Sequence, residues 1–176
     1  MDLEIVGTDL LDLTDGRHAM ERVDRSIEVD APISTVYNQW TQFESFPAFM
    51  EGVEAVTQLD DATVHWVAEV GGKRKEWDAR ITEQVPDEVI AWEGFGDSDN
   101  LGRVFFESLD DGRTRISLSI EYQTEGVLEK VGDALGVVAK QVEGDLQRFK
   151  QLMENRGFET GAWRGEIHQR PTGTDL

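Results

Sequence analysis

Hydrophobic and polar residues alternate in short runs along much of the chain after residue 22. The clearest run is Thr114–Gln123, in which Ile116, Leu118, Ile120 and Tyr122 occupy every second position. A period of two is typical of a strand that buries one face and exposes the other. Turns rich in glycine, proline and aspartate separate further runs, which predict strands over about residues 25–30, 53–59, 64–70, 75–84, 89–94 and 103–109.

Three other segments have the spacing of helices. The first comes after the first strand, with Ser34 as its expected N-cap, and runs to Gln42. A second short helix is expected to open at residues 45–47, where proline suits a first turn. After Gln123 hydrophobic residues recur every three or four positions, which predicts one long amphipathic helix over about 127–156, ended by a glycine C-cap at Gly157.

This order of elements predicts an α+β domain: a strand, two short helices, about six antiparallel strands and a long helix. A sheet of hairpins buries one face, and only the last helix is long enough to cover that face. Because such a sheet is curved and a helix is straight, we expect a cavity between them. Residues 1–21 are expected to form an acidic N-terminal extension, 22–157 the ligand-binding domain and 158–176 a C-terminal tail.

Four local sequences carry a family resemblance: SIEVDAPISTVY at 26–37, WTQFESFP at 40–47, IAWE at 90–93 and GRTRI at 112–116. With the order of elements, they resemble the polyketide cyclase/dehydrase family of the START-like, helix-grip superfamily over roughly residues 22–157. The resemblance implies a curved antiparallel sheet of about seven strands around a long C-terminal helix, with two short helices after the first strand. Since this fold hosts binders, carriers and enzymes, the resemblance leaves the function open.

Composition narrows the classes of function. The chain has 36 acidic and 17 basic residues and a net charge of −19, so we expect no nucleic-acid partner and no membrane insertion. A second interpretation of this acidity is a surface that stays hydrated in a salt-rich cytoplasm. The chain has no cysteine, which excludes disulfides and thiolate metal sites. An acidic start and the lack of a long apolar run favour a cytoplasmic protein.

Rings are unusually frequent at the positions expected to face inward. Large rings that meet across a curved sheet leave gaps and offer flat surfaces for stacking. Trp66, Trp77 and Trp92 are expected to form a continuous aromatic wall. The alternative is that the rings interlock as ordinary core. The predicted cavity-lining residues are Tyr37, Trp40, Phe43, Phe46, Phe49, Trp66, Trp77, Trp92, Phe106, Tyr122, Leu135 and Val138.

Few polar residues are placed to do chemistry. Tyr37 and Tyr122 are the best candidates, because a phenol hydroxyl can donate to a carbonyl oxygen. Arg25 and Arg103 begin strands and can reach a cavity rim. The histidines are isolated, and the phosphate-binding glycine motifs are missing, so no metal and no cofactor are expected. The three histidines are His18, His65 and His168, of which the second alternates with a tryptophan and should face outward.

Three functions remain open. The first is a binder or carrier for a small hydrophobic molecule, of aromatic, polyketide-like or isoprenoid type. The second is a polyketide aromatase/cyclase or dehydrase that acts on such a ligand. The third is a protein-interaction module that docks through the leader or through Trp163 in the tail. The sparse polar lining favours the first over the second, and the sequence leaves open both catalysis and the choice between monomer and homodimer.

Overall fold

A computed structural model describes residues 20–70, 72–96, 99–110, 112–123 and 134–168. The strands form one antiparallel sheet in the order β1-β7-β6-β5-β4-β3-β2, and a short β8 pairs with β4. The elements are β1 (Met20–Val29), α1 (Ile33–Trp40), the 3₁₀ helix η2 (Phe43–Ala48), β2 (Val53–Gln58), β3 (Thr63–Val70), β4 (Lys73–Val85), β5 (Val89–Gly96), β6 (Asn100–Ser108), β7 (Thr114–Gln123), α2 (Ala134–Arg156) and β8 (Ile167–His168).

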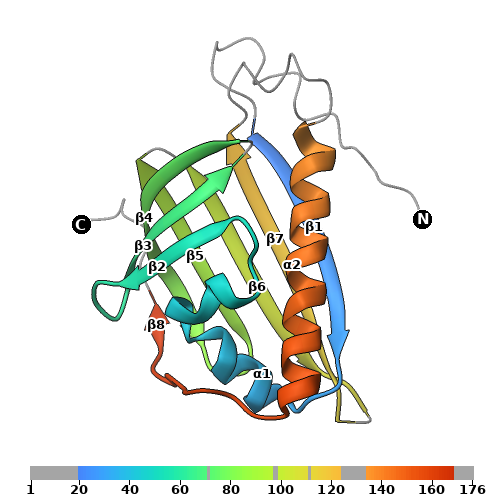
Figure 1. The fold of residues 1–176 in the computed structure, drawn as a ribbon. Helices are drawn as coiled ribbons and strands as arrows, with labels where there is room; N and C mark the ends of the chain where they lie inside the picture. Colours follow the sequence, from blue (N-terminus) through green and yellow to red (C-terminus); the bar gives the residue numbers. More distant parts are fainter. Residues whose placement is uncertain (1–19, 71, 97–98, 111, 124–133, 169–176) are drawn as a thin grey trace.

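The sheet curves around α2, which crosses its concave face in front of β1 and β7 (Figure 1). At one end of the groove, α1 packs beside β6 and η2 packs beside β2. This arrangement is the predicted helix-grip fold, with seven main strands and one long C-terminal helix. Within the described residues, none of the helices is long and apolar enough to cross a membrane.

Aromatic rings from α2 and α1 meet in the core. Phe149 and Met153 of α2 are completely buried, and the Phe149 ring lies edge-on to Trp40 at 4.9 Å between centroids. Trp40 also contacts the rings of Phe49 and Phe106. Such ring pairs add stabilisation beyond their buried area, so this end of the domain is a closed aromatic core.

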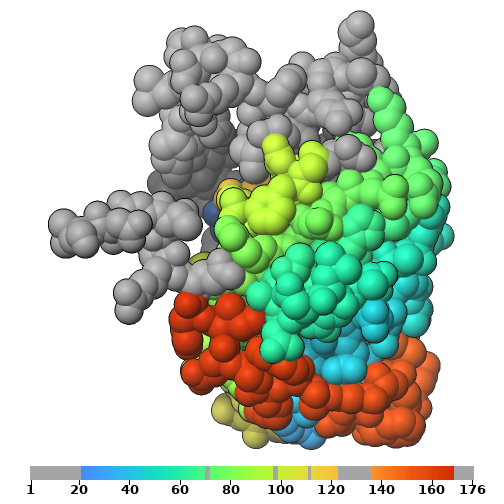
Figure 2. All heavy atoms as spheres, turned by 90° about the vertical axis from the view of Figure 1, so that its left-hand side faces the viewer, coloured from blue at the N-terminus to red at the C-terminus, as the bar shows by residue number. Residues whose placement is uncertain are grey.

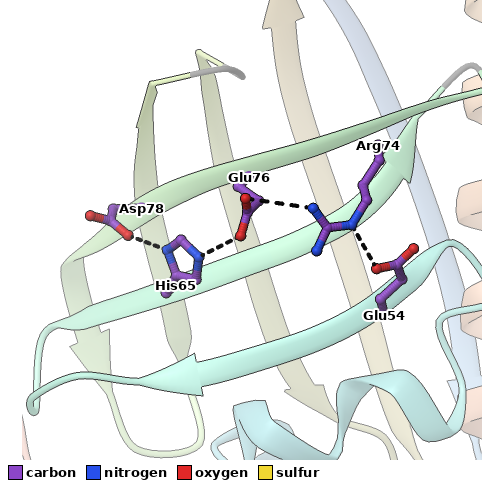
Figure 3. A network of polar contacts seen from close by, with 5 residues as sticks. All are labelled: Glu54, His65, Arg74, Glu76 and Asp78. Atoms are coloured by element: carbon purple, nitrogen blue, oxygen red, sulfur yellow. Dashed lines mark hydrogen bonds and ion pairs between the residues drawn. The ribbon is translucent and has the colours of Figure 1, made fainter.

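The two faces of the sheet differ sharply at the β3–β4 pair. Trp66 lies opposite Trp77 on the concave face, and the next pair in register, His65 and Asp78, lies on the convex face. The outward orientation predicted for His65 is confirmed. Its Nδ1 lies 2.7 Å from a carboxylate oxygen of Asp78, and its Nε2 lies 3.4 Å from Glu76 (Figure 3). Strand alternation therefore separates an aromatic face from a charged one.

The ion-pair network on the convex face extends beyond the histidine. Arg74 contacts Glu76 at 3.6 Å and Glu54 on β2 at 3.1 Å, which links three strands through side chains (Figure 3). All these side chains are substantially exposed, so each pair contributes little to stability, on the order of 1 kcal/mol or less.

Several predicted boundaries were wrong for local reasons. Ser34 does not cap α1: the helix begins at Ile33 after Pro32, whose φ of −62° suits the entry to a helix, and no side chain caps it. The helix ends at Trp40, and the second short helix begins at Phe43 as a 3₁₀ helix, earlier than predicted. At the other end of the domain the prediction for Gly157 is confirmed, because its φ is +77° and its N–H donates to the Met153 carbonyl.

Most of residues 94–102, which connect the strands predicted at 89–94 and 103–109, belong to the paired strands β5 and β6. Gly94 pairs with Asn100, and Trp92 pairs with Gly102. A Cβ atom at Gly102 would overlap the Trp92 indole, and one at Gly94 would meet the Asn100 carboxamide at 2.5 Å. The glycines therefore make room for the large side chain that lies opposite each of them, and the ladder continues through them.

The C-terminal segment after α2 packs along the domain. Arg164 donates to Asn38 at 2.7 Å and to Asp87 at 2.9 Å, and the Trp163 N–H donates to the Thr41 hydroxyl. The segment then pairs as β8 with β4, beyond the point where β3 begins. Figure 2 shows it in red as a band across the lower part of one face. Residues 1–19 of the extension predicted at 1–21, the start of the predicted long helix at 127–133 and the tail beyond 168 lie outside the described residues. Residues 20 and 21 belong to β1, so the first strand begins earlier than predicted.

Candidate functional site

A cavity of about 230 Å³ lies between the concave face of the sheet, η2 and α2. An apolar cavity of about 150 Å³ is enough to hold benzene, so this space has room for a slightly larger flat molecule. Its lining comes from both short helices, five strands and the long helix. The described lining residues are Trp40, Phe43, Phe46, Phe49, Met50, Val64, Trp66, Lys75, Trp77, Ala79, Ile81, Trp92, Asn100, Leu118, Ile120, Tyr122, Val138, Gln141, Val142, Asp145 and Leu146.

Two stacked indoles form part of this lining. Trp66 and Trp77 are register partners on β3 and β4, and their rings stack at 5.8 Å between centroids with an angle of 4° between planes. Phe46 of η2 lies against Trp66 at 5.6 Å. Because the two rings are parallel and stacked, they form one aromatic unit in the cavity wall.

Trp92 lines the same cavity but does not continue this stack. It lies opposite Ile81 on β4, whereas Trp77 lies opposite Gly96, four residues further along β5. Four residues of strand span about 13 Å. The expectation of one continuous wall of three indoles was therefore wrong in detail, because the register separates Trp92 from the other two along the strand.

Trp92 is instead part of a polar corner of the cavity. Its indole N–H donates to the carboxamide oxygen of Asn100 at 3.3 Å. Asn100 lies directly opposite Tyr122 in the β6–β7 ladder, so both side chains point to the concave face. This corner brings an amide and a phenol to a lining that is otherwise largely apolar.

The Tyr122 hydroxyl is buried and has no hydrogen-bond partner among the described residues. Burial, followed by the negative charge of Glu21, raises the pKa of Tyr122 above its usual value. The group is therefore a neutral phenol at physiological pH, able to donate one hydrogen bond and to accept others.

A second set of polar groups comes from α2. Asp145 accepts hydrogen bonds from the Arg148 guanidinium and from the Glu51 N–H. Burial nevertheless raises the pKa of the Asp145 carboxyl, and it outweighs the lowering by Arg148. Gln141 lies one turn earlier, where Gly52 leaves room for its amide.

The structure places most of the predicted lining residues at this cavity. Nine of the twelve line it: Trp40, Phe43, Phe46, Phe49, Trp66, Trp77, Trp92, Tyr122 and Val138. Tyr37 and Phe106 pack edge-on to each other at 5.2 Å in the closed core and do not line it. Leu135 belongs to the first turn of α2, but its side chain lies outside the described part of the structure.

The other polar candidates lie elsewhere. Arg25 pairs with Glu143 of α2 at 2.7 Å, and Arg103 lies over Phe105 and pairs with Glu83 at 3.3 Å. His168 contacts Glu166, and His18 lies outside the described residues. Within the part of the chain that the structure describes, no group of three or more histidine and acidic side chains could hold a metal ion.

Four polar lining residues were missed by the sequence interpretation. Lys75 and Asn100 have the period-two spacing of their strands, since each lies two positions before another inward residue, Trp77 or Gly102. Gln141 and Asp145 flank the apolar stripe of α2 at helical spacing. The periodicity alone could have placed all four residues at inward positions. However, a polar residue at such a position can also mean that the inner face of the strand or helix was assigned wrongly.

Comparisons with known proteins agree with this fold. The family model described as "Polyketide cyclase / dehydrase and lipid transport" matches residues 29–151. An uncharacterized 17.2 kDa protein of the melC2-rnhH intergenic region of Streptomyces lincolnensis is 52% identical over 149 residues, which cover 84% of this chain and 99% of that protein.

Solved structures show the same architecture at low sequence identity. The Zhui aromatase/cyclase from Streptomyces sp. R1128 matches with a TM-score of 0.68 and 20% identity, over 82% of this chain and all of that chain. A START superfamily protein from Mycobacterium smegmatis matches with a TM-score of 0.63 and 16% identity, over 74% of this chain and 98% of the other. At these identities the likeness establishes the fold alone.

Proposed function

The chain belongs to the polyketide cyclase/dehydrase and lipid transport family, and on this basis we propose that it binds a small hydrophobic molecule in the cavity as a binder or carrier. The proposed ligand is an aromatic, polyketide-like or isoprenoid molecule. The observation that carries the proposal is the stacked pair Trp66–Trp77, whose parallel rings line a cavity of about 230 Å³. A flat ring laid against such a surface gains stacking as well as burial.

The lining argues against a sugar or a highly charged metabolite. Each polar group of a ligand that enters an apolar site without a partner costs about 1–3 kcal/mol. The described wall supplies many ring and aliphatic surfaces and only five polar side chains, which are Lys75, Asn100, Tyr122, Gln141 and Asp145. This small number of polar side chains suits a ligand with a hydrophobic body and one or two oxygen atoms.

Catalysis is the second candidate function, and one observation favours it. Two groups with raised pKa values, Tyr122 and Asp145, line the same cavity from opposite walls. A neutral phenol and a carboxyl of raised pKa are suited to general acid or base work on a ketone. An aromatase/cyclase or dehydrase role would require product formation from a poly-ketone substrate, and that turnover should fall in both Tyr122→Phe and Asp145→Asn.

Two measurements test the binding proposal. Native mass spectrometry of the freshly purified protein should reveal a co-purified small molecule, and tryptophan fluorescence should be quenched saturably by naphthalene derivatives. The variant Trp77→Leu keeps a hydrophobic side chain but removes the ring, so affinity measured by calorimetry should fall about tenfold. Trp163→Phe is the matched control, because Trp163 does not line the cavity, and its affinity should equal that of the wild type. If a broad panel of aromatic and isoprenoid compounds gives no saturable change while the fold is intact, the rings are ordinary core and the proposal is wrong.

A further inference from the structure

The Tyr122 hydroxyl is the most informative unused group of the cavity. It is buried, it belongs to a residue that lines the cavity, and no described residue satisfies it. A buried hydroxyl without a partner destabilises a fold by about 1–3 kcal/mol, so proteins rarely retain one without a use for it. The hydroxyl belongs to a surface that already presents flat rings, which suggests that the missing partner is an atom of the ligand.

The surroundings of the Tyr122 hydroxyl indicate what kind of ligand atom it can bind. Asn100 lies directly opposite Tyr122, and its carboxamide oxygen faces the Trp92 indole, which can only donate. This contact fixes the orientation of the Asn100 carboxamide. The Tyr122 hydroxyl, by contrast, has no hydrogen-bond partner among the described residues. Since the pKa of Tyr122 is raised by burial, the phenol keeps its proton and can donate it.

The row that contains Tyr122 leads back to the stacked indoles. Pairing across the sheet connects Tyr122 to Asn100, Gly94 and Ala79, and the neighbouring inward position of β4 is Trp77. The residue of this row nearest the stack, Ala79, is small, and the Asn100 carboxamide lies over Gly94. Because Trp66, Trp77, Asn100 and Tyr122 line the same cavity, a flat ligand can lie against the indole pair with its body and direct one edge toward the corner formed by Asn100 and Tyr122.

We propose that Tyr122 recognises an oxygen of the ligand, by donating a hydrogen bond to a carbonyl of an aromatic ketone or quinone held against the Trp66–Trp77 pair. This inference rests on the proposed binding function and narrows its ligand class. It selects oxygenated aromatic molecules over hydrocarbons of the same shape. Tyr122 acts here as a specificity-determining residue, and no reaction is implied.

A pair of isosteric probes tests the inference. Methyl naphthyl ketone and isopropenylnaphthalene have nearly the same planar shape, but only the ketone accepts a hydrogen bond. In Tyr122→Phe the preference for the ketone, measured as the ratio of the two dissociation constants, should fall about threefold to tenfold. The affinity for the hydrocarbon should stay within about twofold of the wild type, because the ring and the cavity shape are kept.

The matched control deletes the other buried tyrosine hydroxyl. Tyr37→Phe removes a phenol hydroxyl from the closed core, which does not line the cavity, so the ketone preference should not change. In the wild-type protein alone, the infrared carbonyl stretch of the bound ketone should lie below its value in an apolar solvent. That signature reports the hydrogen bond whether or not the variant folds well.

The outcomes separate the two claims. If both probes bind the wild type, but the ketone preference is the same in Tyr122→Phe and the carbonyl stretch is not lowered, the inference is wrong and the binding function stands. If neither probe binds the wild type, the proposed function fails and the inference fails with it. A loss of preference confined to Tyr122→Phe, with a lowered carbonyl stretch in the wild type, supports both.

Discussion

Tyr37 and Tyr122 lie in two regions that look alike in sequence and differ in structure. Each is a tyrosine among hydrophobic residues, and each has a buried hydroxyl without a well-formed hydrogen bond to described residues. Tyr37 is sealed: it is fully buried, it packs against Phe106, and the Arg164 guanidinium covers its ring at 5.5 Å. Tyr122 instead faces the cavity. Phe106 lies six positions along β6 from Asn100, the partner of Tyr122, so the two regions are separated by about 20 Å.

The size of the side chains on α2 explains the difference. At the closed end the helix presents Phe149 and Met153, which fill the space against Trp40 and are completely buried. Toward the cavity it presents Val138 and Val142, which are shorter and leave room. A straight helix on a curved sheet leaves a gap that large side chains must fill. The α2 residues described as lining the cavity are Val138, Gln141, Val142, Asp145 and Leu146, and none of these has an aromatic ring.

The largest expected effect on stability comes from removing a large buried side chain at the closed end. Phe149→Ala should lower the free energy of unfolding by about 3–5 kcal/mol, since it removes a ring that contacts both Trp40 and Phe49. Val138→Ala at the cavity is the comparison variant and should cost about 1 kcal/mol or less. Urea unfolding of both variants measures this difference. Equal losses would mean that the helix is packed uniformly and that no cavity separates the two regions.

Filling the cavity should lower the ligand affinity without lowering the stability of the fold. Ala79 is buried and lines the cavity, so Ala79→Leu would occupy ligand space with a side chain that the fold can accept. We expect the affinity for naphthalene derivatives to fall at least about tenfold, while the melting temperature stays the same or rises. Calorimetric titration and thermal unfolding provide the two values. A variant that is strongly destabilised would show that the indoles already interlock around this position.

Removing the Arg164 side chain, which covers the closed end, should have a smaller effect on stability. Arg164→Gln removes the ion pair to Asp87 and the charge over Tyr37, and it weakens the contact to Asn38. Because the arginine side chain is partly exposed, the expected loss of unfolding free energy is about 1 kcal/mol. Ligand affinity should not change, since this segment does not line the cavity. A fall in affinity as large as that of Trp77→Leu would contradict the separation of the two regions.

The smallest expected effect is a pH dependence of stability from the convex face. Hydrogen bonds to Asp78, and then to Glu76, raise the pKa of His65 above 6.5. The protonated histidine is therefore favoured in the folded protein, so its contribution is fully present below pH 6.5 and is lost as the pH rises through the raised pKa. Urea unfolding between about pH 5 and pH 9 should show this loss in the wild type and not in His65→Gln. An equal loss in the variant would assign it to another group.

Strand alternation carried most of what could be predicted. In β7 a period of two is enough to place Tyr122 and Leu118 on the inner face, because that period fixes the face geometrically. The pattern could not separate Tyr37 from Tyr122, since burial alone does not tell a filled space from an open one. It also could not reveal the docking of residues 158–168, because that segment is held by side-chain bonds such as Arg164 to Asp87, which follow no period.

The central claim is that the cavity admits a flat aromatic ligand against its indoles. The chain has five tryptophans, and their indole N–H resonances can be followed by NMR during a titration with methyl naphthyl ketone. The account predicts that the Trp66, Trp77 and Trp92 signals shift along one common saturation curve. The Trp163 signal should stay in place, because that residue lies on the C-terminal segment away from the cavity. Unchanged signals from Trp66, Trp77 and Trp92, or a shift confined to Trp163, would contradict the account.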